Sequence, residues 1–175
     1  MITIVAGLWK GKQLPALPRG ARPVSQKTRA AIFSTLGERV VGSSILDLYA
    51  GSGALGLEAL SRGADMVVFV DKSVTSLKQN CRAISSPNVS VIQSDTAKFV
   101  GKDKGLYGII FIDPPYAELK LDLVEKAIDL LKSDGVIVLS CSSKTQIDSE
   151  RFNIVQQKNY GDAQILYIQK SIVSI

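Results

Sequence analysis

The chain has 175 residues, of which 46% are hydrophobic and 21% charged, a balance typical of a soluble globular protein with a buried core. It contains no histidine, which excludes a Ser-His-Asp triad and histidine metal sites, and its two cysteines, Cys81 and Cys141, lack metal-ligand spacing. No stretch is long and apolar enough for a transmembrane helix, and the N-terminus has no secretory signal pattern, so we expect a cytoplasmic protein without a metal.

The net charge of +5 is distributed unevenly. Residues 1–42 contain seven basic residues and only one acidic residue, Glu38, whereas residues 43–175 contain 14 basic and 15 acidic residues. The first segment therefore has a net charge of +6 and the second a net charge of −1. Such a basic segment is typical of a surface that faces a polyanion, and the alternative is a solvated basic surface without a partner. We therefore divide the chain into a basic extension, 1–42, and a second unit, 43–175.

The extension is predicted to contain a hairpin and a helix. Residues 2–7 and 11–17 have the pattern of two short strands around Leu8-Trp9-Lys10-Gly11. Ser25 is suited to cap a helix that ends at Gly37. The spacing of its apolar residues predicts that Ala31, Ile32 and Leu36 face inward.

From residue 43 onward, apolar strand-length segments alternate with helical ones. Strands are predicted at 44–50, 65–71, 88–95, 107–113 and 135–141, and helices at 54–63, 73–84 and 121–135, the second capped by Ser73. The last helix is predicted to place Leu123, Ala127, Leu130 and Leu131 on one face and to end at Gly135. Residues 151–160 and 163–172 form a closing strand pair around Gly161-Asp162.

This order predicts a doubly wound α/β fold. Its sheet has seven strands, mostly parallel, with the last strand antiparallel because no helix separates the closing pair. The fourth strand is expected beside the first. In such sheets ligands bind beyond the carboxyl ends of the strands, at the point where the strand order reverses.

Residues 51–56, Gly-Ser-Gly-Ala-Leu-Gly, match GxGxxG, which alone is a weak indicator of a cofactor site. Glycine allows close approach of a ligand, and the following helix offers free N–H groups. Both a nicotinamide dinucleotide and S-adenosylmethionine suit this loop, and Asp71 suits their ribose hydroxyls. Asp47 favours S-adenosylmethionine, because a nicotinamide-binding strand is usually apolar there, and Asp95 is placed to meet an adenine amino group. Strand-end capping is the alternative for Asp71 and Asp95.

The sequence Asp113-Pro114-Pro115-Tyr116 forms a stiff corner after the fourth strand, because prolines donate no N–H and restrict the preceding residue. A plain proline turn is the simplest explanation, but the glycine loop favours a chemical role. A base amino nitrogen is a poor nucleophile because its lone pair is delocalised. The Asp113 carboxylate and the Pro114 carbonyl are suited to accept hydrogen bonds from the two N–H groups of the amine. These bonds would aim the nitrogen lone pair at a methyl sulfonium. Tyr116 offers a stacking face, and no histidine base is needed.

These residues resemble a known family. The corner resembles motif IV of the amino-methyltransferases, and "LDLYAGSGALGLEALSRGA" resembles their motif I. With "AGLWKGKQL" and "RPVSQKTRAAIFSTL", nearly the whole chain resembles the RsmD family, which methylates guanine N2 in bacterial 16S ribosomal RNA. Three positions depart from the family pattern: Val24 replaces a usual threonine, Ala30 follows Arg29 where the family forms an Arg-Glu pair, and Ser140-Cys141 stands where a glutamate is common.

The resemblance implies roles for particular residues. S-adenosylmethionine would be bound by residues of the glycine loop and the strand ends: Asp47, Tyr49, Ala50, Gly51, Ser52, Gly53, Asp71, Lys72, Asp95 and Thr96. The guanine would be held by Asp113, Pro114, Pro115 and Tyr116. RNA would be contacted by basic residues of the extension: Lys10, Lys12, Arg22, Lys27 and Arg29.

The function expected from this resemblance is methylation of a guanine amino group in small-subunit ribosomal RNA, either free or within an assembling subunit, by a monomer. One alternative is a DNA or other RNA amino-methyltransferase acting on adenine N6 or cytosine N4; for DNA, 175 residues leave little room for a target-recognition region. A second alternative is a non-catalytic RNA- or cofactor-binding module, against which the intact Asp113–Tyr116 corner argues. A nicotinamide dehydrogenase is the least favoured.

Overall fold

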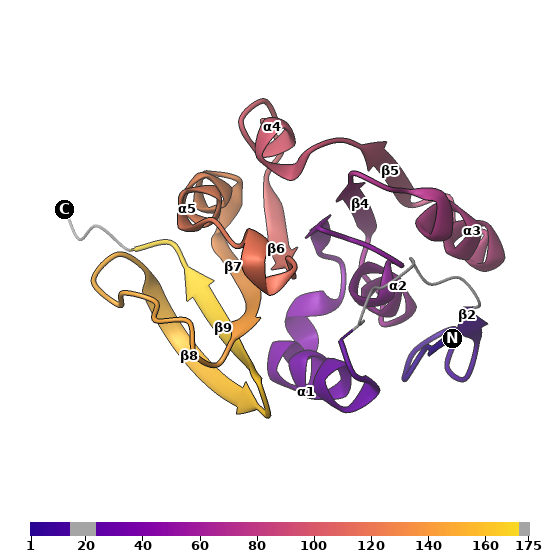
Figure 1. The fold of residues 1–175 in the computed structure, drawn as a ribbon. Helices are drawn as coiled ribbons and strands as arrows, with labels where there is room; N and C mark the ends of the chain where they lie inside the picture. Colours follow the sequence, from indigo (N-terminus) through magenta and orange to yellow (C-terminus); the bar gives the residue numbers. More distant parts are fainter. Residues whose placement is uncertain (15–23, 172–175) are drawn as a thin grey trace.

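The computed structural model describes residues 1–14 and 24–171. Its centre is a seven-stranded sheet in the order β5-β4-β3-β6-β7-β9-β8 (Figure 1). The strands are β3 (Ser44–Leu48), β4 (Met66–Asp71), β5 (Val89–Gln93), β6 (Tyr107–Ile112), β7 (Leu131–Ser142), β8 (Asn153–Tyr160) and β9 (Ala163–Gln169). Strands β3 to β7 pair in parallel, and β9 runs antiparallel to both β7 and β8. The predicted α/β fold, the antiparallel last strand and the adjacency of β3 and β6 are confirmed.

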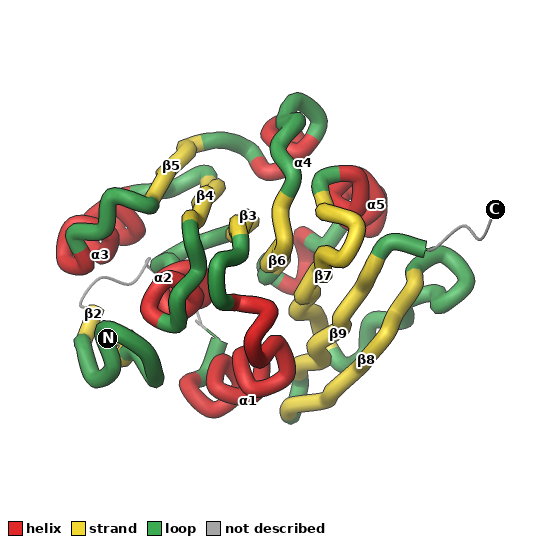
Figure 2. Tube along the Cα trace, turned by 180° about the vertical axis from the view of Figure 1, so that it is seen from behind, coloured by secondary structure: helices red, strands yellow, loops and turns green. Residues whose placement is uncertain are grey.

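Helices cover both faces of the sheet, as Figure 2 shows from behind. One face packs against α1 (Gln26–Leu36), α2 (Ala54–Ser61) and α3 (Thr75–Ile84), and the other against α4 (Thr96–Val100) and α5 (Leu121–Asp129). Alternating residues of each strand therefore enter two separate apolar cores. Phe111 of β6 belongs to the core under α1, whereas its neighbour Ile112 belongs to the core under α5. The two short 3₁₀ segments are η1 (Gly37–Val40) and η2 (Tyr116–Glu118).

The N-terminal hairpin is present with shorter strands than predicted, and residues 15–17 of its predicted second strand lie outside the described residues. Strands β1 (Ile2–Thr3) and β2 (Gln13–Leu14) pair antiparallel in a small separate sheet. Ser25 caps α1 by accepting a hydrogen bond from the Thr28 N–H at 3.0 Å, and Gly37 is the C-cap with φ of 54°. Ile2, Leu14 and Ile32 enter the same core as the sheet residues, so the hairpin and α1 pack against the sheet.

The helix predicted at 121–135 was too long. Helix α5 ends at Asp129, and the Leu130 carbonyl accepts a hydrogen bond from the Tyr107 N–H at 2.8 Å. Leu131, the first residue of β7, pairs with Tyr107 of β6. The register then shifts before Val136 of β7 pairs with Ile109 of β6. Leu130, the C-cap of α5, and Leu131, the first residue of β7, are both buried in the same core as Leu123. Tertiary pairing with β6 therefore outweighs the helical periodicity of this segment.

Two further local differences concern helix starts. Helix α3 begins at Thr75 with Val74 as N-cap, and the expected cap residue Ser73 instead donates its N–H to Asp71 Oδ1 at 2.8 Å. Helix α4 was not predicted from the sequence; Asp95 caps it by accepting a hydrogen bond from the Lys98 N–H at 3.0 Å.

In the part of the chain that the structure describes, no helix is long and apolar enough to cross a membrane.

Candidate active site

The strand order reverses between β3 and β6. From β3 the chain continues outward to β4 and β5, and then returns to β6 on the other side of β3. Both strands run in the same direction, so their carboxyl ends lie side by side. The glycine loop follows β3 and the Asp113–Tyr116 corner follows β6, which brings the two sequence motifs to one point of the sheet edge (Figure 1).

The glycine loop has a conformation that its sequence makes possible. Gly51 and Gly53 have φ of 56° and 81°, in the left-handed region that glycine adopts without strain, and the non-glycine residue Tyr49 also has a positive φ of 58°. A Cβ on Gly53 would lie 2.6 Å from Leu77 Cδ1, so this position also has no room for a side chain. The buried Asn80 fixes the loop by donating from Nδ2 to the Ser52 carbonyl at 2.9 Å.

Two acids support this loop from different sides. Asp71, at the end of β4, accepts a hydrogen bond from the Gly51 N–H at 2.8 Å. Asp47 is 2% exposed and accepts from the Gly56 N–H in the first turn of α2 at 2.9 Å. Burial raises the pKa of Asp47 to about 8, against the lowering effect of the Gly56 bond. Asp47 therefore acts behind the loop, on the helix N-terminus, whereas Asp71 remains partly accessible.

Asp95 lies at the same edge, beyond β5, and is exposed. Its Oδ2 is 3.3 Å from Lys72 Nζ, and Lys72 Nζ is in turn 3.9 Å from Oε2 of Glu118 in η2. The hydrogen bond from the Lys98 N–H, with help from Lys72, lowers the pKa of the Asp95 carboxyl. Asp95 therefore has a capping role, as N-cap of α4 just after β5, and its side chain remains 48% exposed.

The residues present fit S-adenosylmethionine. Each carboxylate oxygen accepts more than one hydrogen bond, so Asp71 can hold the loop and also receive ribose hydroxyls. Among the residues expected to bind the cofactor, Tyr49, Gly51, Asp71, Lys72 and Asp95 keep accessible surface. The remaining ones are buried and shape the loop and strand ends instead: Asp47, Ala50, Ser52, Gly53 and Thr96.

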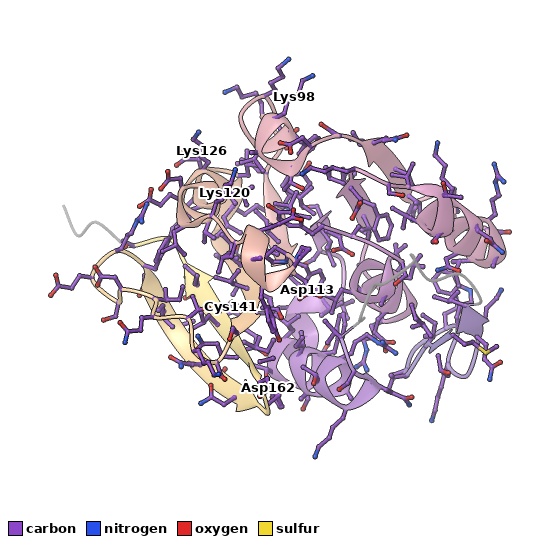
Figure 3. All side chains as sticks on the ribbon, in the orientation of Figure 1. Lys98, Asp113, Lys120, Lys126, Cys141 and Asp162 are labelled. Atoms are coloured by element: carbon purple, nitrogen blue, oxygen red, sulfur yellow. The ribbon has the colours of Figure 1, made fainter. Side chains whose placement is uncertain are left out.

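The corner after β6 is rigid and partly open. Pro114 is buried and Asp113 is half-buried, whereas Tyr116 keeps 51% of its surface exposed. Burial raises the pKa of Asp113 to about 6, and a hydrogen bond from the Ser140 hydroxyl opposes this rise. Figure 3 labels Asp113 near the middle of the molecule in that view. Near neutral pH Asp113 is therefore mainly ionised, and its carboxylate can accept a hydrogen bond from an N–H group.

Arg29 is not available to RNA, contrary to the sequence-based prediction. It is 2% exposed, its guanidinium donates to the Thr3 carbonyl, and its Nε lies 3.4 Å from Glu58 Oε2. Arg29 therefore fastens α1 to the hairpin and to α2. A buried charge on a basic segment has an intramolecular partner, and counting sequence charges cannot distinguish it from a surface charge.

The other predicted RNA residues have different positions. Lys10, Lys12 and Lys27 are exposed, in the hairpin turn, beside β2 and in the first turn of α1. Arg22 lies outside the described residues. Asp113 and α1 lie on the same face of the sheet, because Phe111, two residues before Asp113, contacts Phe33 of α1 with ring centroids 5.8 Å apart.

A Rossmann-like sheet whose glycine loop and strand-end acids meet an Asp-Pro-Pro-Tyr corner at the switch point belongs to the S-adenosylmethionine-dependent methyltransferases. The profile of the family described as "Conserved hypothetical protein 95" matches residues 2–169. The chain belongs to this family, the RsmD family, as its motifs indicated.

The similarity to individual proteins extends over most of the chain. The chain is 36% identical to the ribosomal RNA small subunit methyltransferase D of Escherichia coli K12 over 139 residues, which cover 77% of this chain and 68% of that relative. It is 34% identical to the protein of the same name from Haemophilus influenzae, covering 91% and 89%. A hypothetical protein of Thermus thermophilus has a similar solved structure, with a TM-score of 0.86, 27% identity, and coverage of 97% and 100%.

Sequence reasoning missed three residues that support the site. Glu58 and Asn80 are fully buried polar residues of α2 and α3, and Ser140 lies beside Asp113. A single acid within the apolar helix sequence "ALGLEALS" was a detectable signal for Glu58. Ser140 stood out in the sequence only as a departure from the family pattern, and its position beside Asp113 depends on which strands are neighbours.

Proposed function

We propose that this protein transfers a methyl group from S-adenosylmethionine to the N2 amino group of a guanine in small-subunit ribosomal RNA. The observation that carries the proposal is the position of the Asp113–Tyr116 corner beside the glycine loop, in a chain of the family whose curated relatives are named for ribosomal RNA methylation. The enzyme is proposed to act as a cytoplasmic monomer on RNA that is free or in an assembling subunit.

The proposed chemistry relies on position rather than on a strong base. Bound S-adenosylmethionine would supply an electrophilic methyl group at the loop. The ionised Asp113 carboxylate and the Pro114 carbonyl accept hydrogen bonds from the two N–H groups of the target amine, which favours a tetrahedral nitrogen with its lone pair free. As the nitrogen takes the methyl group, the methyl–sulfur bond would break, S-adenosylhomocysteine would leave, and the proton that the amine loses would pass to the Asp113 carboxylate. The exposed ring of Tyr116 holds the base by stacking.

The unit at 43–175 is proposed to hold the cofactor through Asp71, Asp95 and the loop, while the extension at 1–42 contacts RNA. Lys10, Lys12 and Lys27 support this proposal because they are exposed and have no ion-pair partner among the described residues. A flipped guanine loses stacking, at a cost of a few kcal/mol, roughly, which backbone contacts can offset. Arg29 is excluded from this set by its burial.

Nucleoside mass spectrometry of small-subunit ribosomal RNA treated with the protein and S-adenosylmethionine tests the proposal. We expect N2-methylguanosine with the wild type and a single-turnover rate lower by about 10²-fold or more with Asp113→Ala, at unchanged cofactor affinity. Asp162→Ala, in the exposed β8–β9 turn, is the matched control and should behave as wild type (Figure 3). Methylated adenine or cytosine would assign the alternative amino-methyltransferase, and RNA binding without any methylation would assign a binding module.

The RNA surface has a separate test in the salt dependence of binding. Changing Lys10, Lys12 and Lys27 together to alanine should flatten the plot of log affinity against log salt by about 2, at a slope of about 0.7 per phosphate. A matched change of Lys98, Lys102 and Lys104, exposed lysines of α4 and its following loop, removes the same charge elsewhere. Equal effects of the two triple variants would show that total charge, and not the extension, binds RNA.

A further inference from the structure

The strand register brings Ser140 next to Asp113. In the parallel pair of β6 and β7, Ile112 is aligned with Leu139, so the following residues of the two strands are Asp113 and Ser140. Phe111 and Val138 belong to the core under α1, and side chains alternate along a strand. Asp113 and Ser140 therefore share the α1 face of the sheet at its carboxyl edge.

Ser140 is fixed in place and its hydroxyl is directed to Asp113. Its backbone pairs with Ile165 of β9, on the side opposite β6. The residue is 7% exposed, and a buried hydroxyl requires a hydrogen-bond partner. That partner is the Asp113 carboxylate, and the bond from Ser140 lowers the pKa of Asp113 against the effect of burial.

We propose that Ser140 is a positioning residue for the methyl transfer: its hydroxyl holds the Asp113 carboxylate so that an oxygen of Asp113 faces the target amine. This inference rests on the proposed function. A carboxylate attached only through its own rotatable side chain would sample several orientations, and the hydrogen bond from a residue locked between β6 and β9 restricts them. The bond also favours the ionised form, in which both carboxylate oxygens accept and no O–H donor competes with the N–H of the amine.

Other charges near Asp113 do not substitute for Ser140. Asp47 on β3 is coupled electrostatically to Asp113, and its own pKa is raised to about 8, so it is largely protonated at neutral pH. On the helices of the same face, Arg29 of α1 and Glu58 of α2 are paired with each other. The hydrogen bond from Ser140 thus opposes the rise in the pKa of Asp113 that burial causes.

The test compares Ser140→Ala with Ser140→Thr, which keeps the hydroxyl, and with Ser142→Ala, a serine of the same strand whose Oγ accepts from the Lys144 N–H. Carbon-13 NMR of the Asp113 carboxyl in the free protein should titrate about one to two pH units higher in Ser140→Ala. Ser140→Thr and Ser142→Ala should keep the wild-type midpoint. This measurement needs no substrate, so it separates failure of this inference from failure of the proposed function.

Single-turnover methylation then tests the catalytic consequence. In Ser140→Ala the pH at half-maximal rate should move upward with the Asp113 midpoint, and the plateau rate should fall about tenfold or more, with S-adenosylmethionine affinity unchanged. Ser140→Thr should restore both quantities. An Asp113 midpoint that is unaffected by Ser140→Ala would overturn the inference, as would a loss of rate that is equal at every pH and is not rescued by threonine.

Discussion

Replacing Glu58 with glutamine should release the N-terminal hairpin from the sheet domain. The Glu58 carboxylate is fully buried and accepts hydrogen bonds from the Val5 N–H at 2.8 Å, the Ala6 N–H at 3.0 Å and Arg62 Nε at 2.8 Å. Its Oε2 is also the partner of the buried Arg29. One carboxylate therefore joins the hairpin and α1 to the helix that follows the glycine loop.

The magnitude follows from what the substitution leaves behind. Glutamine has one acceptor oxygen and presents an NH₂ group to the other donors, so a backbone N–H loses its partner. Arg29 keeps its charge at 2% exposure without a counter-charge. Removing one member of a buried pair costs about 3–5 kcal/mol, a large part of a typical total of roughly 5–15 kcal/mol.

Urea unfolding measures this loss, and the single tryptophan makes it specific. Trp9 lies in the hairpin turn, and its backbone N–H donates to Ser61 Oγ of α2 at 3.0 Å, so its fluorescence reports hairpin docking. Far-ultraviolet circular dichroism reports the whole fold. At a urea dependence of about 2 kcal/mol per molar, the fluorescence midpoint of Glu58→Gln should fall by roughly 1.5–2.5 M, ahead of the dichroism transition.

Two further variants complete the design. Glu38→Gln, an exposed glutamate of η1 without an ion-pair partner among the described residues, should change stability by less than about 0.5 kcal/mol. The double variant Arg29→Met/Glu58→Leu removes both charges and should recover part of the loss. A Glu58→Gln protein that unfolds with the wild-type midpoints would show that this carboxylate does not hold the hairpin on the sheet domain.

Three other predictions concern the loop and its supports. Asp71→Ala should weaken S-adenosylmethionine binding by about 1–3 kcal/mol, because it removes a hydroxyl acceptor and the partner of the Gly51 N–H; calorimetry with unchanged affinity would contradict this role. Asp47→Asn should be more stable than wild type at pH 8.5 by at least about 1 kcal/mol and equal to it near pH 4. The reason is that the folded-state pKa of Asp47 is raised from 3.8 to about 8, so wild-type stability declines as pH rises across that interval; urea unfolding at both pH values decides. Gly56→Ala should cost about 1–3 kcal/mol in thermal unfolding, since its Cβ would lie 2.3 Å from Phe69 Cε1, whereas Gly101→Ala, with no heavy atom nearer than 3.4 Å, should be nearly neutral.

Local sequence patterns were sufficient to predict the class of fold and the two motifs of the site. Alternating apolar strands and helices are local signals, and so are a glycine run after a strand and two consecutive prolines after another. The structure confirms the mostly parallel sheet with its antiparallel last strand, and it confirms that the fourth predicted strand, β6, lies beside the first, β3. Because β3 was predicted beside β6, the sequence was enough to predict that Gly51 and Asp113 lie at one edge of the sheet.

Tertiary structure alone decided which charged and polar residues are available. Arg29 and Lys27 are two residues apart and equally basic in sequence, yet the first turns inward to Glu58 and the second faces solvent. Leu131 begins a strand instead of extending the predicted helix, because its backbone pairs with Tyr107 of β6. Ser140 acquires its role from Asp113, which lies 27 positions earlier in the chain and becomes its neighbour only when β6 and β7 align. Contacts between residues far apart in sequence decide burial and hydrogen bonding, because local periodicity carries no information about which element supplies the partner.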